Sequence, residues 1–344
     1  MIFVTGEIIL DIILHVGPPK TGSTSIQQFL KQKKELLGEK GFFVPSTKHS
    51  NMTEFHYANR QKLGLNRSSV RLGLNDENLS EKREAFLSDL NEQFAIARNE
   101  GFHTVLATSE GLSGLSKVEM DALKVWFSTQ FNLTNIVFTL RRQDLRSISL
   151  YKNNIKNNRA TEQNCLIDRR PMQYHLTLKK WVELFGQENV KPILFPDSVP
   201  ELRDFMQDYC DICDIDGVYD LKEAESFRRN SALDGQAIEF LRLLNISSET
   251  KDVSKPSRGR KMLERVLVKE FRTSPQKVRP SRSEVENFYE KYRDGNEEIR
   301  KMFFPDRTSL FNEDFSSYPE VSVYPELDID FITRLGRAIE TEIQ

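Results

Sequence analysis

The residues from 12 to 27 constrain the fold of this chain more than any other segment. They begin with the apolar run Ile12–Val16, continue through a turn of glycine, proline and hydroxyl residues at 17–24, and become amphipathic from Ser25 onward. This order predicts a buried strand, a tight loop and the N-terminus of a helix. Such a loop directs backbone N–H groups and the positive end of the helix dipole at one point, which favours an anion. The sequence therefore predicts a phosphate-binding loop.

The loop nearly matches the nucleotide-binding P-loop, G-x-x-x-x-G-K-[ST]. Gly17 and Gly22 have the required spacing, and Thr24 occupies the last position. Ser23, however, stands where the P-loop has its lysine, while Lys20 lies inside the loop. A Walker-type kinase needs that lysine on the β- and γ-phosphates and a hydroxyl on Mg²⁺. A lysine before the second glycine would instead lie nearer to the group being transferred, which disfavours a kinase.

Residues 18–25, Pro-Pro-Lys-Thr-Gly-Ser-Thr-Ser, resemble a loop of the sulfotransferases that use 3′-phosphoadenosine 5′-phosphosulfate (PAPS). In that family the loop has the pattern P-K-[ST]-G-[ST]-[ST] and binds the 5′-phosphosulfate. The resemblance implies that backbone N–H groups and hydroxyls of this loop hold the donor. The residues that it implies are Lys20, Thr21, Gly22, Ser23, Thr24 and Ser25.

A second segment carries the other half of the resemblance. Residues 135–140 form a short, β-branched apolar run that predicts a buried strand. Arg141 follows the strand, and Ser149 comes eight residues later on the expected helix. In PAPS-dependent sulfotransferases an arginine and a serine with this spacing bind the 3′-phosphate, a group that suits a bidentate cation and neutral donors. The alternative, a solvated basic helix face that includes Arg142 and Arg146, leaves the loop upstream unexplained.

Apolar runs and amphipathic segments alternate along the first 220 residues. The predicted strands are 8–16, 41–45, 104–108, 135–140 and 190–195. The predicted helices are 25–37, 81–99, 117–130 and 174–185. This alternation predicts an α/β fold with a parallel β-sheet flanked by helices. The resemblance implies that the sheet is P-loop-like and has the three-layer architecture of sulfotransferases. Ligands of such sheets bind at the carboxyl ends of the strands, so Gly17, Glu110 and Arg141 are expected to share one rim.

The length of 344 residues fits one α/β enzyme domain over residues 1–344. Its core is expected at about 8–220, followed by a helical and loop-rich extension at about 221–344. The resemblance to bacterial and carbohydrate-type sulfotransferases extends to about Phe311, and it is specific only at the two phosphate motifs.

The extension contains a local basic cluster whose role the sequence leaves open. Residues 246–261 are polar and are expected to form a loop, with helices before it at 229–244 and after it at 284–302. Many sulfotransferases close the cofactor site with a basic segment late in the chain, and the segment from Lys251 to Lys261 is similar in character. A solvated loop is the alternative.

Composition excludes several classes of protein. The net charge is −2 with 29% charged residues, which is not the basic excess of a bulk nucleic-acid binder. No apolar run approaches the ~20 residues that a membrane span requires. The N-terminus lacks a basic region of the kind that precedes a signal sequence, so a cytoplasmic location is expected. The three cysteines, Cys165, Cys210 and Cys213, indicate packing rather than a disulfide framework or a metal site.

The chemistry needs a cation and a base. In sulfuryl transfer an acceptor oxygen attacks in line and charge builds on the leaving oxygen, which a cation can neutralise without a metal. Lys20 is the candidate, although it could equally bind phosphate without acting in the chemical step. The acceptor hydroxyl needs a general base. His56, after a polar loop, and Glu110, after the strand at 104–108, are the two candidates, whereas His15 and His103 are expected to be structural.

The sequence therefore predicts a PAPS-dependent sulfotransferase that works without metal, releases PAP and sulfates an acceptor hydroxyl. A glycan is the expected acceptor because the loop, Pro-Lys-Thr-Gly-Ser-Thr-Ser, lacks the tryptophan typical of cytosolic small-molecule enzymes. No nucleic-acid partner is expected, and the oligomeric state is left open. The alternatives are a P-loop nucleotide kinase and a non-catalytic protein that binds a nucleotide.

Overall fold

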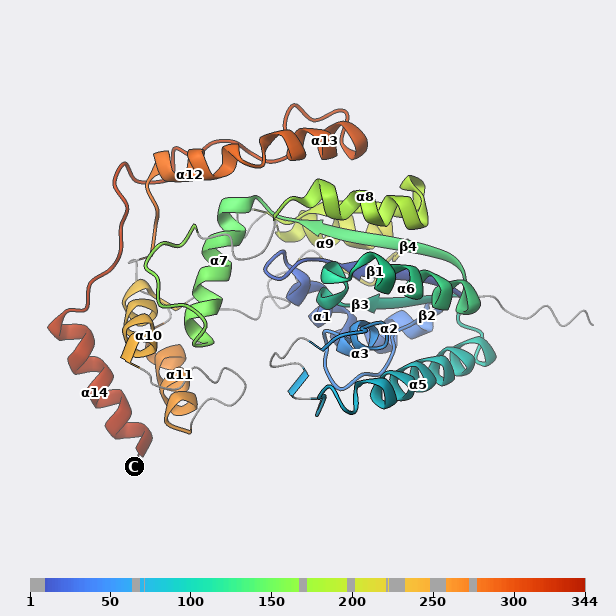
Figure 1. The fold of residues 1–344 in the computed structure, drawn as a ribbon, viewed down its shortest axis with the longest axis horizontal. Helices are drawn as coiled ribbons and strands as arrows, with labels where there is room; N and C mark the ends of the chain where they lie inside the picture. The colour runs from blue at the N-terminus through green and yellow to red at the C-terminus, as the bar shows by residue number, and fades with distance from the viewer. Residues whose placement is uncertain are drawn as a thin grey trace, which may run out of the picture. The chain divides into compact units, whose positions relative to one another are not determined.

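The computed structural model describes residues 10–63, 69–70, 72–166, 172–196, 202–220, 222, 233–247, 258–271 and 277–343. Five parallel strands form a sheet in the order β2-β3-β1-β4-β5 (Figure 1). Their bounds are Leu10–Val16 for β1, Phe42–Phe43 for β2, Thr104–Thr108 for β3, Phe131–Leu140 for β4 and Val190–Leu194 for β5. The predicted α/β class with a parallel sheet is confirmed.

β1 lies in the middle of the sheet because its side chains are nearly all apolar, as a strand buried on both faces requires. Residues 8 and 9 of the predicted strand lie outside the described residues. β4 begins at Phe131, four residues before the predicted start, because its backbone pairs with β1 as far back as Leu10. Sequence periodicity misses this extension, since a backbone ladder does not need apolar side chains.

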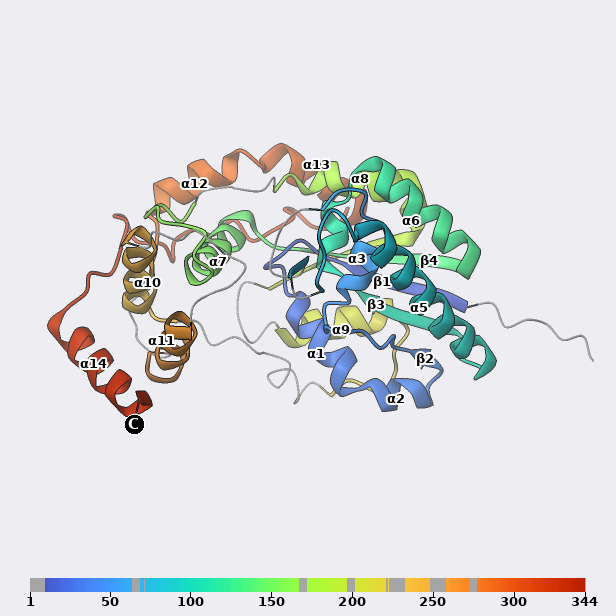
Figure 2. The same cartoon turned by 60° about the horizontal axis from the view of Figure 1, so that its bottom comes forward.

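Helices cover both faces of the sheet. Their bounds are Ser23–Gln32 for α1, Lys34–Glu39 for α2, Thr53–Tyr57 for α3, Leu79–Asn99 for α5, Lys117–Gln130 for α6, Tyr174–Phe185 for α8 and Leu202–Ile212 for α9. On one face, Tyr209 of α9 makes edge contacts with His15 of β1 and Phe29 of α1. On the other, Phe94 of α5 contacts Phe131 of β4. Figure 2 shows α6 and α8 across the sheet from α1 and α9, which gives three layers.

Two predicted segments differ from the structure near the loop. The helix expected at 25–37 is divided into α1 and α2, because Lys33 has a ψ of 11° and leaves the helical conformation. The polar loop expected before His56 ends instead in the short helix α3, which contains His56. This turn buries Phe55 completely, and the ring then packs against Phe94 and Trp126.

The described residues group into two compact units. The first takes its residues from Met1–Arg142, Gln173–Arg229 and Glu298–Phe311 and contains the whole sheet. The second takes them from Gln143–Met172, Asn230–Glu297 and Asn312–Gln344. The prediction of one domain with an extension from about residue 221 stays a prediction. The grouping of residues 143–172 with much later residues was not expected from the sequence.

The second unit is helical. Its helices are α7 at Gln143–Lys156, α10 at Gly235–Ser247, α11 at Arg258–Glu270, α12 at Arg282–Glu290 and α14 at Ile329–Ile343. A further helix, α13 at Arg293–Phe303, begins in this unit and ends in the first. The helix predicted at 284–302 is therefore divided into α12 and α13. Of the helix predicted at 229–244, the first residues lie outside the described part of the chain.

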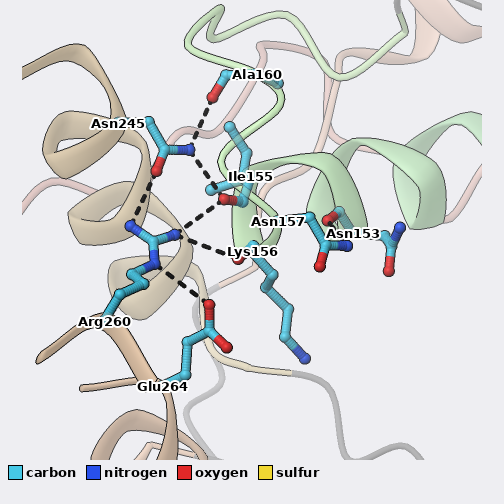
Figure 3. A network of polar contacts seen from close by, with 8 residues as sticks. All are labelled: Asn153, Ile155, Lys156, Asn157, Ala160, Asn245, Arg260 and Glu264. Atoms are coloured by element: carbon cyan, nitrogen blue, oxygen red, sulfur yellow. Dashed lines mark hydrogen bonds and ion pairs between the residues drawn. The ribbon is translucent and has the colours of Figure 1, made fainter. Parts of the chain in front are cut away.

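Arg260 and Asn245 hold the C-terminal end of α7 (Figure 3). Asn245 donates to the carbonyls of Ile155 and Ala160, both at 2.9 Å, while Arg260 donates to those of Ile155 and Lys156 at 3.2 and 3.3 Å. Arg260 also donates to the Asn245 side chain at 3.0 Å. The last carbonyls of a helix lack partners within it, so these contacts satisfy them.

This network corrects the prediction for the basic segment. Residues 258–261 belong to helix α11, not to a loop, and residues 251–257 lie outside the described residues. The guanidinium of Arg260 binds backbone carbonyls of α7, together with Glu264 at 3.3 Å. In the described part of this segment, Arg260 therefore has a structural role in the second unit.

Candidate functional site

The loop between β1 and α1 contains two residues in the left-handed conformation. Lys20 has a φ of 74° and Gly22 a φ of 100°. Glycine adopts this region freely, whereas a lysine there costs about 1–2 kcal/mol. Thr21 is fully buried, and its hydroxyl donates to the Pro18 carbonyl at 2.7 Å. The loop is thus a closed turn that keeps a strained residue at the position of the predicted catalytic lysine.

The N-terminus of α1 opens onto this loop without a side-chain cap. Ser23 and Ser25 are buried, and Thr24 is half-buried. The N–H of Ser25 donates to the Gly22 carbonyl at 2.9 Å, so this predicted donor is engaged within the loop. The first N–H groups of a helix have no partner within it, and with the helix dipole they attract an anion.

Phe195, which directly follows β5, connects Gly22 with Arg141. A Cβ atom on Gly22 would collide with the Phe195 ring, and the Arg141 guanidinium lies over the same ring at 5.1 Å from its centroid. Arg141 also donates to the Lys20 carbonyl at 3.1 Å, and its own carbonyl accepts from Tyr174 at 2.8 Å. The ends of β4 and β5 therefore meet the loop at one rim. Sequence reasoning missed Phe195 as a site residue, although its place at the carboxyl end of the strand predicted at 190–195 was a signal.

Gly22→Ala is expected to lower the free energy of unfolding by about 1–3 kcal/mol more than Gly101→Ala does. Both glycines have left-handed φ values, 100° and 83°, but a Cβ at Gly101 would meet nothing within 4 Å. The difference between the two variants, measured by denaturant unfolding, isolates the collision with Phe195. If both variants lost the same free energy of unfolding, the Phe195 ring would have to move away from the added Cβ atom without an energetic cost.

Ser149, the predicted partner of Arg141, lies on α7 and is half-buried. Arg141 belongs to the first compact unit and Ser149 to the second, so their convergence on one phosphate stays a prediction. The alternative of a solvated basic face is wrong for the two neighbouring arginines. Arg142 and Arg146 are only 4% and 2% exposed, so neither charge is directed at water.

Glu110 contacts the start of α1. It begins the short 3₁₀ helix η1, Glu110–Gly114, directly after β3, and its carboxylate accepts a hydrogen bond from the Ser23 hydroxyl. The side-chain oxygen of Asn51 accepts from the Glu110 N–H at 2.9 Å and from the Gln27 side chain at 3.3 Å. Asn51, which sequence reasoning did not identify, therefore helps to hold the candidate base Glu110 at the loop. These contacts hold Glu110 next to the loop, which agrees with the prediction that Gly17, Glu110 and Arg141 share one rim of the sheet.

His56, the other candidate base, packs against Gly111, the residue that follows Glu110 in sequence. A Cβ atom on Gly111 would approach the imidazole Nδ1 to 2.7 Å. Burial, together with the charge of Arg60, lowers the pKa of His56 to about 4. The imidazole is thus neutral at pH 7 but a weak base, since the most effective catalytic pKa lies near the working pH.

His15 lies beneath the loop and has a structural role, as expected. It is fully buried, and its ring nitrogens share hydrogen bonds with the hydroxyls of Thr108 at 2.8 Å and Thr139 at 2.6 Å. Burial lowers the pKa of His15 to about 3, so the ring is a neutral bridge between β3 and β4. A Cβ atom on Gly17 would come within 3.3 Å of this ring, which explains the glycine.

Other expectations concern metals, thiols and membranes. The described residues contain no group of three His, Cys, Asp or Glu side chains that could hold a metal ion. All three cysteines are buried free thiols, and burial raises the pKa of Cys165 and of Cys210 to about 12. Among the helices that the structure describes, none is long and apolar enough to cross a membrane.

Comparison with known proteins gives a limited likeness. No family model matches the chain, and no curated protein matches its sequence. It is similar to the crystal structure of a sulfotransferase from Alicyclobacillus acidocaldarius, with 14% identity over 83% of this chain and 94% of that one and a TM-score of 0.40. It is also similar to the sulfotransferase domain from the curacin biosynthetic pathway, with 10% identity over 82% and 97% and a TM-score of 0.37. At these values the likeness supports no conclusion about activity or substrate, which therefore depend on the residues themselves.

Proposed function

We propose that this chain is a sulfotransferase that moves the sulfuryl group of PAPS to an acceptor hydroxyl. The observation that carries the proposal is the hydrogen bond from Arg141 to the Lys20 carbonyl at 3.1 Å. These residues lie 121 positions apart, and the sequence assigned them independently to the 3′-phosphate and the 5′-phosphosulfate of one donor. Their contact is what a single nucleotide site between a strand end and a loop requires.

The residues of the loop fit the donor. The uncapped and largely buried start of α1 suits the 5′-phosphosulfate, with hydroxyls from Ser23 and Thr24 beside it. Arg141 offers a planar cation for the 3′-phosphate, and Ser149 is proposed to complete that site. When bound, the donor supplies the sulfuryl group and leaves as PAP.

The residues of this chain would then act in two roles. We assign Lys20 to neutralising the charge that develops on the leaving oxygen, because its loop position lies before the second glycine. We assign the removal of the acceptor proton to Glu110, since its carboxylate contacts Ser23 at the start of α1, whereas the His56 ring packs against Gly111. The acceptor that we propose is a carbohydrate hydroxyl, on the resemblance of the loop to carbohydrate-type enzymes.

Calorimetric titration with PAP in the absence of metal tests the donor site. We expect wild type to bind and Arg141→Ala to bind about 10- to 100-fold more weakly, the value of a hydrogen bond to a charged group. Arg98→Ala is the matched control, because Arg98 also donates to a backbone carbonyl, that of Gln130 at 3.1 Å, but from the end of α5.

Two other outcomes of the binding and turnover measurements would contradict the proposed sulfotransferase activity. Absence of PAP binding together with Mg²⁺-dependent binding of ATP would replace the sulfotransferase with a P-loop kinase. Tight PAP binding without turnover on any glycan, alcohol or amine acceptor would indicate a protein that binds the nucleotide and does not catalyse transfer.

A further inference from the structure

A cavity of about 560 Å³ lies beside α1 in the first unit. One wall comes from α1 and the start of α2, and the opposite wall comes from residues 44–53, between β2 and α3. Three lysines line it, Lys31, Lys34 and Lys48, and its lining contains no aspartate or glutamate. A hollow surrounded by cations with no acidic side chain in its wall favours an anionic ligand.

The three lysines are not neutralised within the described part of the chain. Neither Lys31 nor Lys48 has a carboxylate partner there, and the Lys34 ammonium donates to the Ser46 hydroxyl at 2.8 Å, a neutral group. Glu35 directly follows Lys34 in sequence but forms no ion pair with Lys31 or Lys34 within the described residues, and Glu54 accepts from the backbone N–H of Lys48 at 2.8 Å and not from its ammonium. Partial burial lowers the pKa of Lys34, as expected for a cation without a counter-charge.

Two residues of the cavity lining also have buried polar atoms that lack hydrogen-bond partners. Thr53 is only 5% exposed, and its hydroxyl has no hydrogen-bond partner; the same holds for the buried Nε2 atom of His49. A buried polar group without a partner costs stability unless a ligand or water satisfies it.

Two residues connect the cavity to the candidate base. Gln27 and Asn51 both line it, and they hydrogen-bond to each other at 3.3 Å. The same Asn51 oxygen accepts from the N–H of Glu110, whose carboxylate contacts Ser23. A ligand in the cavity would therefore lie next to the residues that hold Glu110.

We propose that this cavity binds an anionic group of the acceptor, a carboxylate or a sulfate ester, so that the acceptor is a sugar that is already acidic. The inference rests on the proposed function, because it takes Glu110 as the base and the cavity as the acceptor side of the site. Lys31, Lys34 and Lys48 supply the positive charge that would attract this group.

The test uses pairs of sugars in which one member carries an anionic group that its counterpart lacks. Each sugar is titrated into the protein with and without saturating PAP. The pairs are methyl glucuronide with methyl glucoside, glucose 6-sulfate with glucose, and unsulfated chondroitin tetrasaccharide with its carboxyl-reduced form. We expect at least one anionic member to bind about tenfold more tightly than its neutral twin, and the preference to weaken with salt. The carboxylate and sulfate pairs show which anion is preferred.

Two triple variants test whether the cavity causes the preference for anionic over neutral sugars. The triple variant Lys31→Gln, Lys34→Gln, Lys48→Gln should lose the preference while binding PAP as wild type does. The control is Lys40→Gln, Lys62→Gln, Lys124→Gln, which removes the same charge from exposed lysines outside the cavity and should keep the preference. The proposal is overturned if wild type prefers no anionic sugar, or if the first triple variant retains the preference. Failure of PAP to bind would instead contradict the proposed function, and titration of sugars without PAP would still decide on the cavity.

Discussion

Replacing Lys20 by glycine is expected to remove most of the turnover and to leave the fold as stable as wild type. The ammonium is lost, and removal of one group that stabilises a developing oxyanion costs about 10²–10³ in kcat. The backbone at Lys20 has a φ of 74°, which glycine adopts without strain. The strain released and the greater freedom of glycine in the unfolded chain are each about 1 kcal/mol, so the free energy of unfolding should change by less than about 1 kcal/mol.

Three measurements make this prediction decisive: kcat with PAPS, the affinity for PAP, and the free energy of unfolding. Asp214→Gly is the matched control, since Asp214 has a φ of 53° at an exposed position of the same unit. Lys20→Arg keeps the charge but changes its shape. If Lys20→Gly turns over normally, Lys20 has no part in the chemical step. If kcat is unchanged at saturation and PAP affinity falls instead, Lys20 only binds the donor.

The conformation of Lys20 connects local strain with function. A left-handed lysine persists only where the surroundings fix it, and here Thr21 closes the loop below it while Arg141 binds its carbonyl. Glycine at this position would have given the same loop with less strain. A strained lysine is expected to persist here only if its ammonium takes part in binding or catalysis. Lys20→Gly measures both the strain, through the free energy of unfolding, and the contribution of the ammonium, through kcat.

Local signals predicted much of the first unit. Helix α6 was predicted with its observed bounds, and its start depends on local residues, because Ser116 and Glu119 form a capping box at the N-terminus within four residues of sequence. β3 was predicted with its observed bounds for a similar reason, since an apolar run between two turns fixes its own ends. The expected sharing of one rim by strand ends follows from parallel topology, which the alternation of elements already specified.

The parts that could not be predicted depend on contacts between distant residues. Phe195 becomes important only because the fold brings it against Gly22, and Asn51 only because it meets Glu110. The burial that lowers the pKa of His56 is likewise invisible in its sequence neighbours. The helix predicted at 25–37 is interrupted at Lys33, where the sequence has no glycine or proline that would have indicated a break. Tertiary packing decided each of these features.

Glu110→Gln is expected to lower kcat by about 10²–10⁴, the range for loss of a general base. The amide keeps the size of the side chain and a hydrogen-bonding oxygen for Ser23, so PAP should bind with nearly wild-type affinity. Glu92→Gln, on the exposed surface of α5, is the control for removal of a carboxylate. Single-turnover rates with bound PAPS separate the chemical step from donor binding.

His56→Gln is the variant that separates the two candidate bases. Burial holds the pKa of His56 at about 4, so the imidazole is already neutral above that value. If His56 were the base, activity would fall as the pH drops through about 4, and that fall would disappear in His56→Gln together with most of the turnover. With Glu110 as the base, His56→Gln should retain turnover to within about tenfold, because the contacts of the ring with Gly111 and Tyr57 are packing contacts. A loss as large as that of Glu110→Gln would transfer the role of base from the carboxylate to the imidazole.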